Sequence, residues 1–140
     1  MTEPTEIPDD ECRALLHGGV VGRVALCTAD GPMVVPVNYT VVAETIVFRT
    51  SPYGVLARAR DSLVAFEIDE LDHEHQRGWS VVATGRARAV EDGPELAEIQ
   101  AGWDPHPWAG GQRPLYLRLE WTGLSGRRTG SAWDRDDAQE

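Results

Sequence analysis

The chain has 140 residues, which is enough for one domain with its own core. Its formal net charge of −10 excludes nucleic-acid binding, because a protein that binds nucleic acid needs a net basic face. Its 2 cysteines are too few for a disulfide framework or a four-thiolate metal site, and all 13 basic residues are arginine, which excludes Schiff-base catalysis, covalently held pyridoxal phosphate and a phosphate-loop lysine. No apolar run is long enough to span a membrane and the N-terminal segment is acidic, unlike an export signal, so we expect a cytoplasmic protein with reduced thiols and no membrane partner.

The first half of the chain predicts a short helix followed by a three-strand meander. Acidic residues 9–11, then Leu15 and Leu16, then two glycines, are typical of a helix. A second short helix is expected over residues 52–60, because proline is tolerated in a first helical turn. Apolar, β-branched runs separated by turn residues predict three strands, at 20–28, 33–42 and 45–50.

The second half predicts more strands than helices. We expect an alternating strand at 63–69, a charged loop at 70–78 and a long strand at 79–90. After them we expect a helix at 94–101, a loop rich in proline, glycine and tryptophan at 103–113, and a final strand at 115–121. Residues 124–128 either continue the final strand or add another. Six or so strands with two or three short helices predict a mainly β, antiparallel barrel. Strands and helices do not alternate often enough for a doubly wound sheet, and no glycine-rich dinucleotide fingerprint follows the first strand.

The negative charge is concentrated at the two ends of the chain. Residues 1–11 carry five carboxylates and no base, and residues 133–140 carry four carboxylates and one arginine. The part between them has an excess of only two negative charges. We therefore expect acidic, flexible tails at both ends.

The segment from Phe48 to Pro52 is a candidate anion site. A strand ends with Arg49, and two hydroxyl residues and a predicted helix start follow it. Free backbone N–H groups at a helix start favour an anion, and an arginine adds charge-assisted hydrogen bonds. The alternative is that Thr50 or Ser51 caps the helix and Arg49 pairs with a nearby carboxylate.

Two tryptophan-containing segments are further candidates. Trp79 and Ser80 open a strand directly after a charged loop, where they either line a flat aromatic ligand or pack into the core. The loop over 103–111 holds two tryptophans, which either cover a ligand or fasten the loop to its own domain.

Two other patterns do not predict a site. His73 and His75 have no third ligand at a recognisable spacing, so a solvated loop is favoured over a metal site. Residues 123–126 are not the glycine-flanked serine turn of a hydrolase. No hydrolase nucleophile is evident in the sequence.

Five segments, in this order, resemble the pyridoxamine 5′-phosphate oxidase-like proteins, in particular the short actinobacterial branch of these flavin-binding split barrels. The segments are 22–25, 36–39, 46–50, 64–69 and 78–81 with 84–87. The resemblance covers residues 12–128 and leaves 1–11 and 129–140 as the acidic tails. It implies a six-stranded antiparallel split β-barrel that forms a homodimer, with two cofactor sites at the subunit interface.

The resemblance also implies which residues contact flavin mononucleotide (FMN), with the deazaflavin coenzyme as an alternative. They are Pro36, Val37, Asn38 and Tyr39 along the ring edge, Arg49 and Thr50 at the phosphate, Val55 and Leu56 next to it, Trp79, Ser80 and Val81 against the ring, and Trp108 from the loop. Val55 is a departure, because close relatives carry a phosphate-contacting lysine there. Arg58, three residues further on, is a candidate substitute.

The function implied is a flavin-dependent oxidoreductase acting on an unidentified small molecule. The chemistry would belong to the cofactor ring, so no catalytic residue is named. The substrate arginines and histidine expected for the vitamin phosphate are missing, which argues against true pyridoxamine phosphate oxidase activity. The alternative, favoured by Val55, is a non-catalytic binder of deazaflavin or haem, or a cofactor-free dimeric module.

Overall fold

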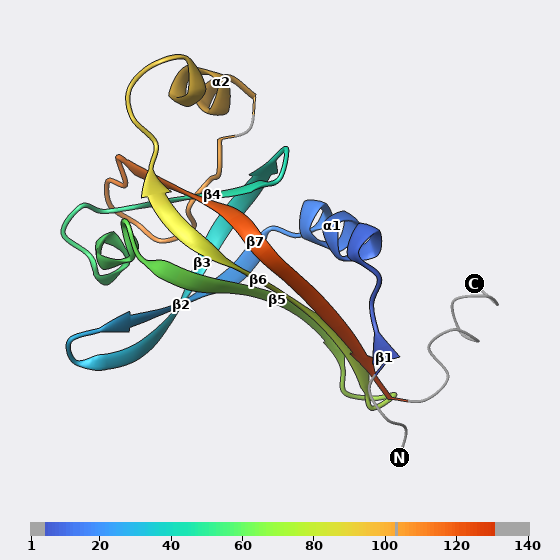
Figure 1. Cartoon of the computed structure of the whole chain (residues 1–140). Coiled ribbons are helices and arrows are strands. Elements are labelled where there is room, and N and C mark those ends of the chain that lie inside the picture. The colour runs from blue at the N-terminus through green and yellow to red at the C-terminus, as the bar shows by residue number, and fades with distance from the viewer. Residues whose placement is uncertain (1–4, 103, 131–140) are drawn as a thin grey trace.

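Six antiparallel strands close into a ring in the computed structural model, which describes residues 5–102 and 104–130 (Figure 1). The strands are β2 Val21–Thr28, β3 Gly31–Val42, β4 Thr45–Thr50, β5 Leu63–Asp72, β6 Arg77–Ala89 and β7 Leu115–Thr129. They pair in the order β7-β4-β3-β2-β5-β6, and a further pairing of β6 with β7 joins the two ends of this row. The predicted six-stranded antiparallel split barrel is therefore confirmed.

Short elements decorate this ring. Strand β1 (Thr5–Glu6) pairs with the far end of β7. The helices are α1 (Asp9–Gly18) and α2 (Pro94–Gly102), with one short 3₁₀ helix, η1 (Val55–Ala59). None of the helices in the described part of the chain is long and apolar enough to cross a membrane.

The charged segment 70–78, expected to be a loop, is mostly strand. Strand β5 continues to Asp72 and β6 begins at Arg77, so the turn between them is only residues 73–76. Asp72 fixes this turn, because it accepts the backbone N–H of His75 at 3.1 Å and pairs with Arg77 at 3.4 Å. The charged residues belong to the end of a hairpin that extends beyond the core (Figure 1), where residues 70–76 are at least partly exposed on both faces.

The final strand is continuous. Strand β7 runs through both predicted segments, 115–121 and 124–128, and pairs with β6 along most of its length. The register shifts at Thr84 and Gly85, which face Gly123 and Trp121, so Thr122 is the extra residue of a β-bulge. The two predicted segments are therefore parts of one bulged strand.

The N-terminal segment is more ordered than the expected tail over residues 1–11. The backbone N–H of Ile7 donates to the carbonyl of Gly126 at 2.9 Å, and the Ile7 side chain is buried. Helix α1 begins at Asp9. Residues 5–11 thus differ from the expectation because Ile7 fills a gap beside β7, whereas residues 1–4 and 131–140 lie outside the described part.

The helix expected over 52–60 is shorter than predicted. Residues 52–54 form a turn in which the Ser51 hydroxyl accepts the backbone N–H of Tyr53 at 3.2 Å. Only Val55–Ala59 is helical, in a single 3₁₀ segment with Ala57 N–H bonded to the carbonyl of Gly54. Proline at position 52 begins the turn and not the helix.

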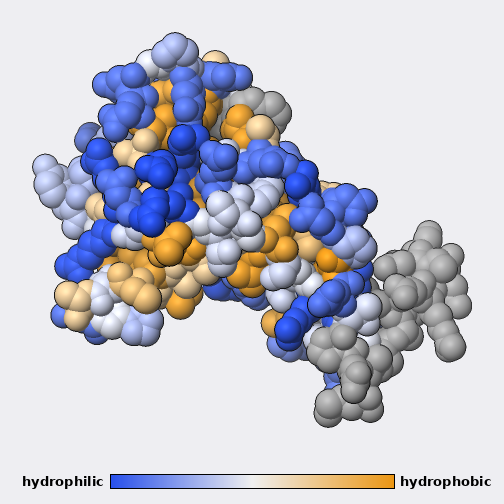
Figure 2. Space-filling view, in the orientation of Figure 1, coloured by the Kyte–Doolittle hydropathy of each residue, from blue (hydrophilic) through white to orange (hydrophobic). Residues whose placement is uncertain are grey.

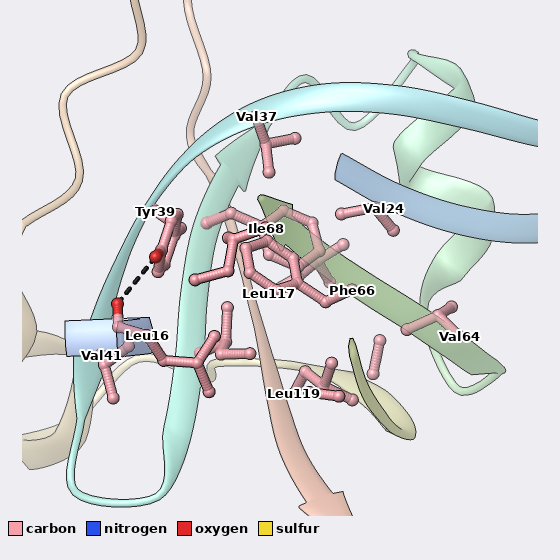
Figure 3. Close-up of a cluster of buried hydrophobic side chains, with 14 of the residues drawn as sticks. Leu16, Val24, Val37, Tyr39, Val41, Val64, Phe66, Ile68, Leu117 and Leu119 are labelled. Carbon is pink, nitrogen blue, oxygen red and sulfur yellow. Dashed lines mark hydrogen bonds between the residues drawn. The ribbon is translucent and has the colours of Figure 1, made fainter. Parts of the chain in front are cut away.

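The core is formed by the inward-facing residues of the six ring strands, with α1 closing one side of the barrel (Figure 3). The inward-facing residues alternate with outward ones, as β-strand geometry requires. Tyr39 and Phe66 meet edge to face with centroids 4.7 Å apart. The Tyr39 hydroxyl donates to the carbonyl of Leu16 at 2.7 Å, which ties α1 to β3.

The ionisation of Tyr39 is expected to lower the folding stability as pH rises in the alkaline range. Burial raises the pKa of its phenol to about 12, whereas an unfolded tyrosine ionises near pH ~10. The unfolded state therefore loses its proton first as pH rises. The stabilisation is complete below pH ~10, and about 2–3 kcal/mol is lost between pH ~10 and ~12.

Denaturant midpoints measured across this alkaline range test the effect. Tyr39→Phe is expected to be about 1 kcal/mol less stable at neutral pH, because it lacks the hydrogen bond to Leu16, and to show a smaller alkaline loss than the wild type. Identical alkaline slopes for the two proteins would contradict this assignment.

Candidate cofactor site

Two of the predicted segments meet where β3 and β4 separate. Tyr39 pairs with Phe48, and both side chains enter the core. The next residues outward on each strand, Asn38 and Arg49, therefore occupy neighbouring positions on the outer face. The sequence placed these two residues eleven positions apart in different motifs, and the strand register brings them together.

Part of the β3 backbone has no strand partner at the place where β3 and β4 separate. Strand β3 pairs with β2 from Gly31 to Asn38, but with β4 only from Tyr39 to Val42. Backbone groups of residues 36–38 that point away from β2 therefore lie outside both ladders. A strand edge of this kind offers N–H donors and C=O acceptors to a flat, polar-edged ligand.

Arg49 is held by the loop that precedes β7. Its Nε donates to the carbonyl of Arg113 at 3.1 Å, and its Nη1 lies 3.4 Å from Asp104 Oδ1 and 3.5 Å from the carbonyl of Pro105. The guanidinium carbon also lies 4.8 Å from the ring centroid of Tyr116. The alternative interpretation is therefore right for Arg49, which pairs with the Asp104 carboxylate. It is wrong for Thr50 and Ser51, because Gly54 precedes η1 and no side chain caps this helix.

Arg49 nevertheless keeps donors for a ligand. A guanidinium has five N–H groups, and the contacts above use only Nε and Nη1. No described residue accepts a hydrogen bond from Nη2. The Nη2 side of the guanidinium can therefore bind two oxygens of a phosphate, a group that arginine binds through parallel N–H donors.

Asn38 has an unused donor of its own. Its Oδ1 accepts the backbone N–H of Trp108 at 2.9 Å, which fixes the orientation of the amide. Its Nδ2 is buried and has no hydrogen-bond partner among the described residues. A buried unpaired N–H costs about 1–3 kcal/mol, so an acceptor on a bound ligand would remove that penalty. The Trp108 side chain itself is 76% exposed beside this amide.

The other predicted phosphate contacts are less available. Thr50 and Leu56 are buried, at 2% and 5% exposure, and Val55 brings no charge. Arg58, the candidate substitute for the missing lysine, lies 3.7 Å from Asp30 at the β2–β3 turn. The five-residue η1 is too short to supply an anion site at its start, so Arg49 is the residue of this segment that can hold an anion.

Trp79, Ser80 and Val81 lie on β6, opposite β3 in the ring. Two strands separate β3 from β6 in either direction. Val81 is fully buried and Trp79 packs against the core, which leaves Ser80 as the outward side chain. Trp79 lines a cavity between the end of α1, the start of β2 and the end of β5. A single chain therefore does not place these residues against Asn38 and Arg49.

Three residues of the site were missed at the level of sequence. Asp104, Arg113 and Tyr116 hold Arg49, and the Tyr116 hydroxyl donates to Asp104 Oδ1 at 2.9 Å. Burial raises the pKa of the Tyr116 phenol, so it is a neutral donor. The one signal was that Asp104 falls within the tryptophan-rich loop already selected.

The histidine pair is part of the hairpin turn. His75 Nδ1 lies 2.7 Å from Asp72 Oδ2, and both residues are at the surface. Across residues 5–102 and 104–130, no group of three or more potential metal ligands is present.

The chain belongs to the pyridoxamine 5′-phosphate oxidase family, whose model matches residues 8–128. An uncharacterized protein of Mycobacterium tuberculosis is 37% identical over 112 residues, covering 76% of this chain and 72% of that protein. The structure resembles that of an FAD-binding protein from Mycobacterium smegmatis, with a TM-score of 0.76, 31% identity and coverage of 90% and 98% of the two chains. An FAD- and haem-binding protein of the same organism shares the fold, with a TM-score of 0.70, 17% identity and coverage of 99% and 80%. The expected family is confirmed.

Proposed function

We propose that this protein binds a flavin nucleotide at the point where β3 and β4 separate, and that it is a flavin-dependent oxidoreductase acting on a small molecule. The observation that carries the proposal is the unpaired edge of residues 36–38 beside two unused side-chain donors, Asn38 Nδ2 and Arg49 Nη2. The FAD-binding protein of M. smegmatis, at 31% identity, supports a flavin as the ligand.

Each residue has a separate task in this proposal. Arg49 Nη2 holds a phosphate, and the Asp104 ion pair keeps the guanidinium in place. Asn38 Nδ2 donates to an acceptor on the ring edge, with its orientation set by Trp108 N–H. When bound, the flavin supplies hydride or electron transfer through its ring. The protein supplies orientation, which accounts for a large part of the rate when reacting atoms are held about 3–3.5 Å apart.

The proposal includes a homodimer, because one chain lacks part of the site. Trp79 and Ser80 would approach the cofactor from the partner's β6. An apolar groove of about 470 Å³ supports pairing with a second copy, since its lining includes Val34 and Leu63, which are 64% and 68% exposed. Figure 2 shows hydrophobic surface in this region, over the β2–β3 hairpin and β5. Large exposed apolar patches mark protein interfaces.

Light scattering coupled to gel filtration tests the dimer. We expect the wild type to elute with twice the chain mass, and Leu63→Arg to shift toward the monomer and to lose flavin affinity with it. Tyr53→Arg, at a position that is 95% exposed and outside the groove, is the matched control. A monomeric wild type that binds flavin stoichiometrically would overturn this part of the proposal.

The visible absorption spectrum tests the cofactor. Protein purified without added cofactor is expected to show flavin bands, and mass spectrometry of the released cofactor distinguishes FMN from FAD and from deazaflavin. Reduction by a nicotinamide donor, or reoxidation by a substrate, should be faster than for free flavin. Equal rates would remove the enzyme proposal and leave cofactor binding.

A non-catalytic or cofactor-free module is the second candidate. Val55 in place of the usual lysine and the Asp104 ion pair on Arg49 both favour weak phosphate binding. This reading predicts that simple dialysis removes any flavin and that added FMN and FAD cause no spectral shift. Haem bands in the purified protein would select a third cofactor.

A further inference from the structure

Three arginines converge on the outer face of the β6–β7 ladder. Arg86 and Arg88 project from β6 and Arg118 projects from β7, on alternate, outward-facing positions. Together with Glu120 and Thr122 they line a pocket of about 240 Å³. Figure 2 shows strongly hydrophilic surface over the end of β6, beneath α2.

The charges in this pocket are unevenly compensated, because Arg86 lies opposite Glu120 in the strand register whereas Arg88 has no carboxylate opposite it. Arg88 lies directly opposite Arg118 in the strand register, and like charges directly opposite each other destabilise a sheet. Arg118 Nε is 3.5 Å from Glu95 of α2, and Arg86 donates to the backbone carbonyl of Asp61 at 2.7 Å. Arg88 has no ion pair or hydrogen bond with any described side chain. Glu120 is the one carboxylate among the lining residues.

This pocket is distinct from the cofactor site. Arg49 pairs in register with Tyr116, whereas Arg118 pairs with Val47, one step further along the same face. Val47, Val90, Tyr116 and Ile99 form a buried cluster between the two places, with Ile99 contributed by α2. An anion held by Arg88 and Arg118 would therefore not be the phosphate held by Arg49.

We propose that Arg86, Arg88 and Arg118 form a second anion site, which binds the phosphate groups of a small molecule other than the flavin. Guanidinium groups match phosphate geometry through paired N–H donors. A dianion between Arg88 and Arg118 would turn their repulsion into two attractive contacts. The pocket volume exceeds the ~30 Å³ share of one water molecule several times over, which leaves room for a diphosphate or for a phosphate with part of its carrier.

Thermal unfolding of the full chain tests the site at constant ionic strength, with chloride as the balancing anion. The probes are inorganic phosphate, pyrophosphate, ADP and adenosine. A ligand of the native state raises the unfolding temperature by mass action. We expect pyrophosphate and ADP to raise it and adenosine to leave it unchanged. Tighter binding of ADP than of pyrophosphate identifies a nucleotide as the ligand, and equal binding identifies the free anion.

Single substitutions distinguish this site from the flavin site. Arg88→Gln and Arg118→Gln are expected to weaken pyrophosphate affinity about tenfold or more, because hydrogen bonds to charged groups are worth that factor. Arg127→Gln removes the same charge from an exposed position on β7 and should match the wild type. Arg49→Ala should keep pyrophosphate binding, and Arg88→Gln should keep flavin binding.

The ligand-free proteins provide a second readout. Arg88→Gln is expected to unfold at an equal or higher temperature than the wild type, because it removes the repulsion from Arg118. The proposal is overturned if no phosphate compound raises the unfolding temperature beyond chloride. It is equally overturned if Arg127→Gln loses as much affinity as Arg88→Gln.

Discussion

Replacing Arg49 by alanine is expected to weaken flavin binding by about 10- to 150-fold, the factor that corresponds to one charge-assisted hydrogen bond of about 1.5–3 kcal/mol. Arg49 is the half-buried cation beside the unpaired edge of β3, and no lysine stands at position 55 to share the phosphate charge. Flavin fluorescence quenching during titration measures the affinity. Arg60→Ala, at a surface ion pair of 3.6 Å with Glu91, is the matched control and should bind flavin as the wild type does.

Asp104→Asn separates phosphate binding from loop anchoring. Asn at position 104 keeps an oxygen that can hold the Arg49 guanidinium in place, but it removes the negative charge that competes with a phosphate. Flavin affinity is therefore expected to be equal or higher. If Arg49 served only to anchor the loop through residues 104, 105 and 113, Asp104→Asn would lower the affinity in the same direction as Arg49→Ala. Loss of affinity in both variants would therefore contradict the phosphate role.

Replacing Phe66 by alanine is expected to cost about 3–5 kcal/mol of unfolding free energy, the range for removing a buried aromatic side chain. Phe66 is fully buried in the centre of the barrel, against Tyr39 at 4.7 Å (Figure 3). A loss of this size is a large fraction of the total stability of a domain, about 5–15 kcal/mol. Urea denaturation measures it, and Tyr53→Ala, at a 95% exposed position, should change stability by less than about 0.5 kcal/mol.

Substitutions at Gly22 and Phe66 are expected to have non-additive effects on the free energy of unfolding. A Cβ atom added at Gly22 would lie 2.2 Å from Cζ of Phe66, which is fully buried, so the ring or the backbone would have to shift. Gly22→Ala should therefore cost about 1–3 kcal/mol as an overpacked site. Phe66→Leu provides space for the methyl group, so the double variant should be more stable than the sum of the two single changes predicts. Strict additivity would show that the ring can move aside.

The Asn38 amide is the least expected part of the site. Only the family resemblance selects residues 36–39, as contacts along the ring edge of the cofactor. The side-chain role follows from two long-range facts, which are the capture of Oδ1 by Trp108 N–H, seventy residues away, and the burial of Nδ2 without a partner. A ligand acceptor for Nδ2 gives a physical reason why this amide stays buried.

The residue pattern alone predicts which segments form strands, because alternation of apolar and polar residues is a local property of the chain. The meander over 20–50 and the strands beginning near 63, 79 and 115 are predictable in this way. So is the family, because its motifs lie within these strands in a fixed order. The absence of lysine excludes lysine chemistry, and the negative charge predicts no nucleic-acid binding, both without any reference to the fold.

How these segments assemble and which side chains meet depends on long-range contacts that no local pattern contains. The pairing of β6 with β7, which closes the ring, the docking of Ile7 beside Gly126 and the partner of Arg49 all join residues far apart in the chain. Local pattern also misjudged residues 70–78, because a strand that is solvated on both faces has the composition of a loop. Register places Arg49 beside Asn38 and Arg88 opposite Arg118, and strand register depends on the packing of the whole barrel.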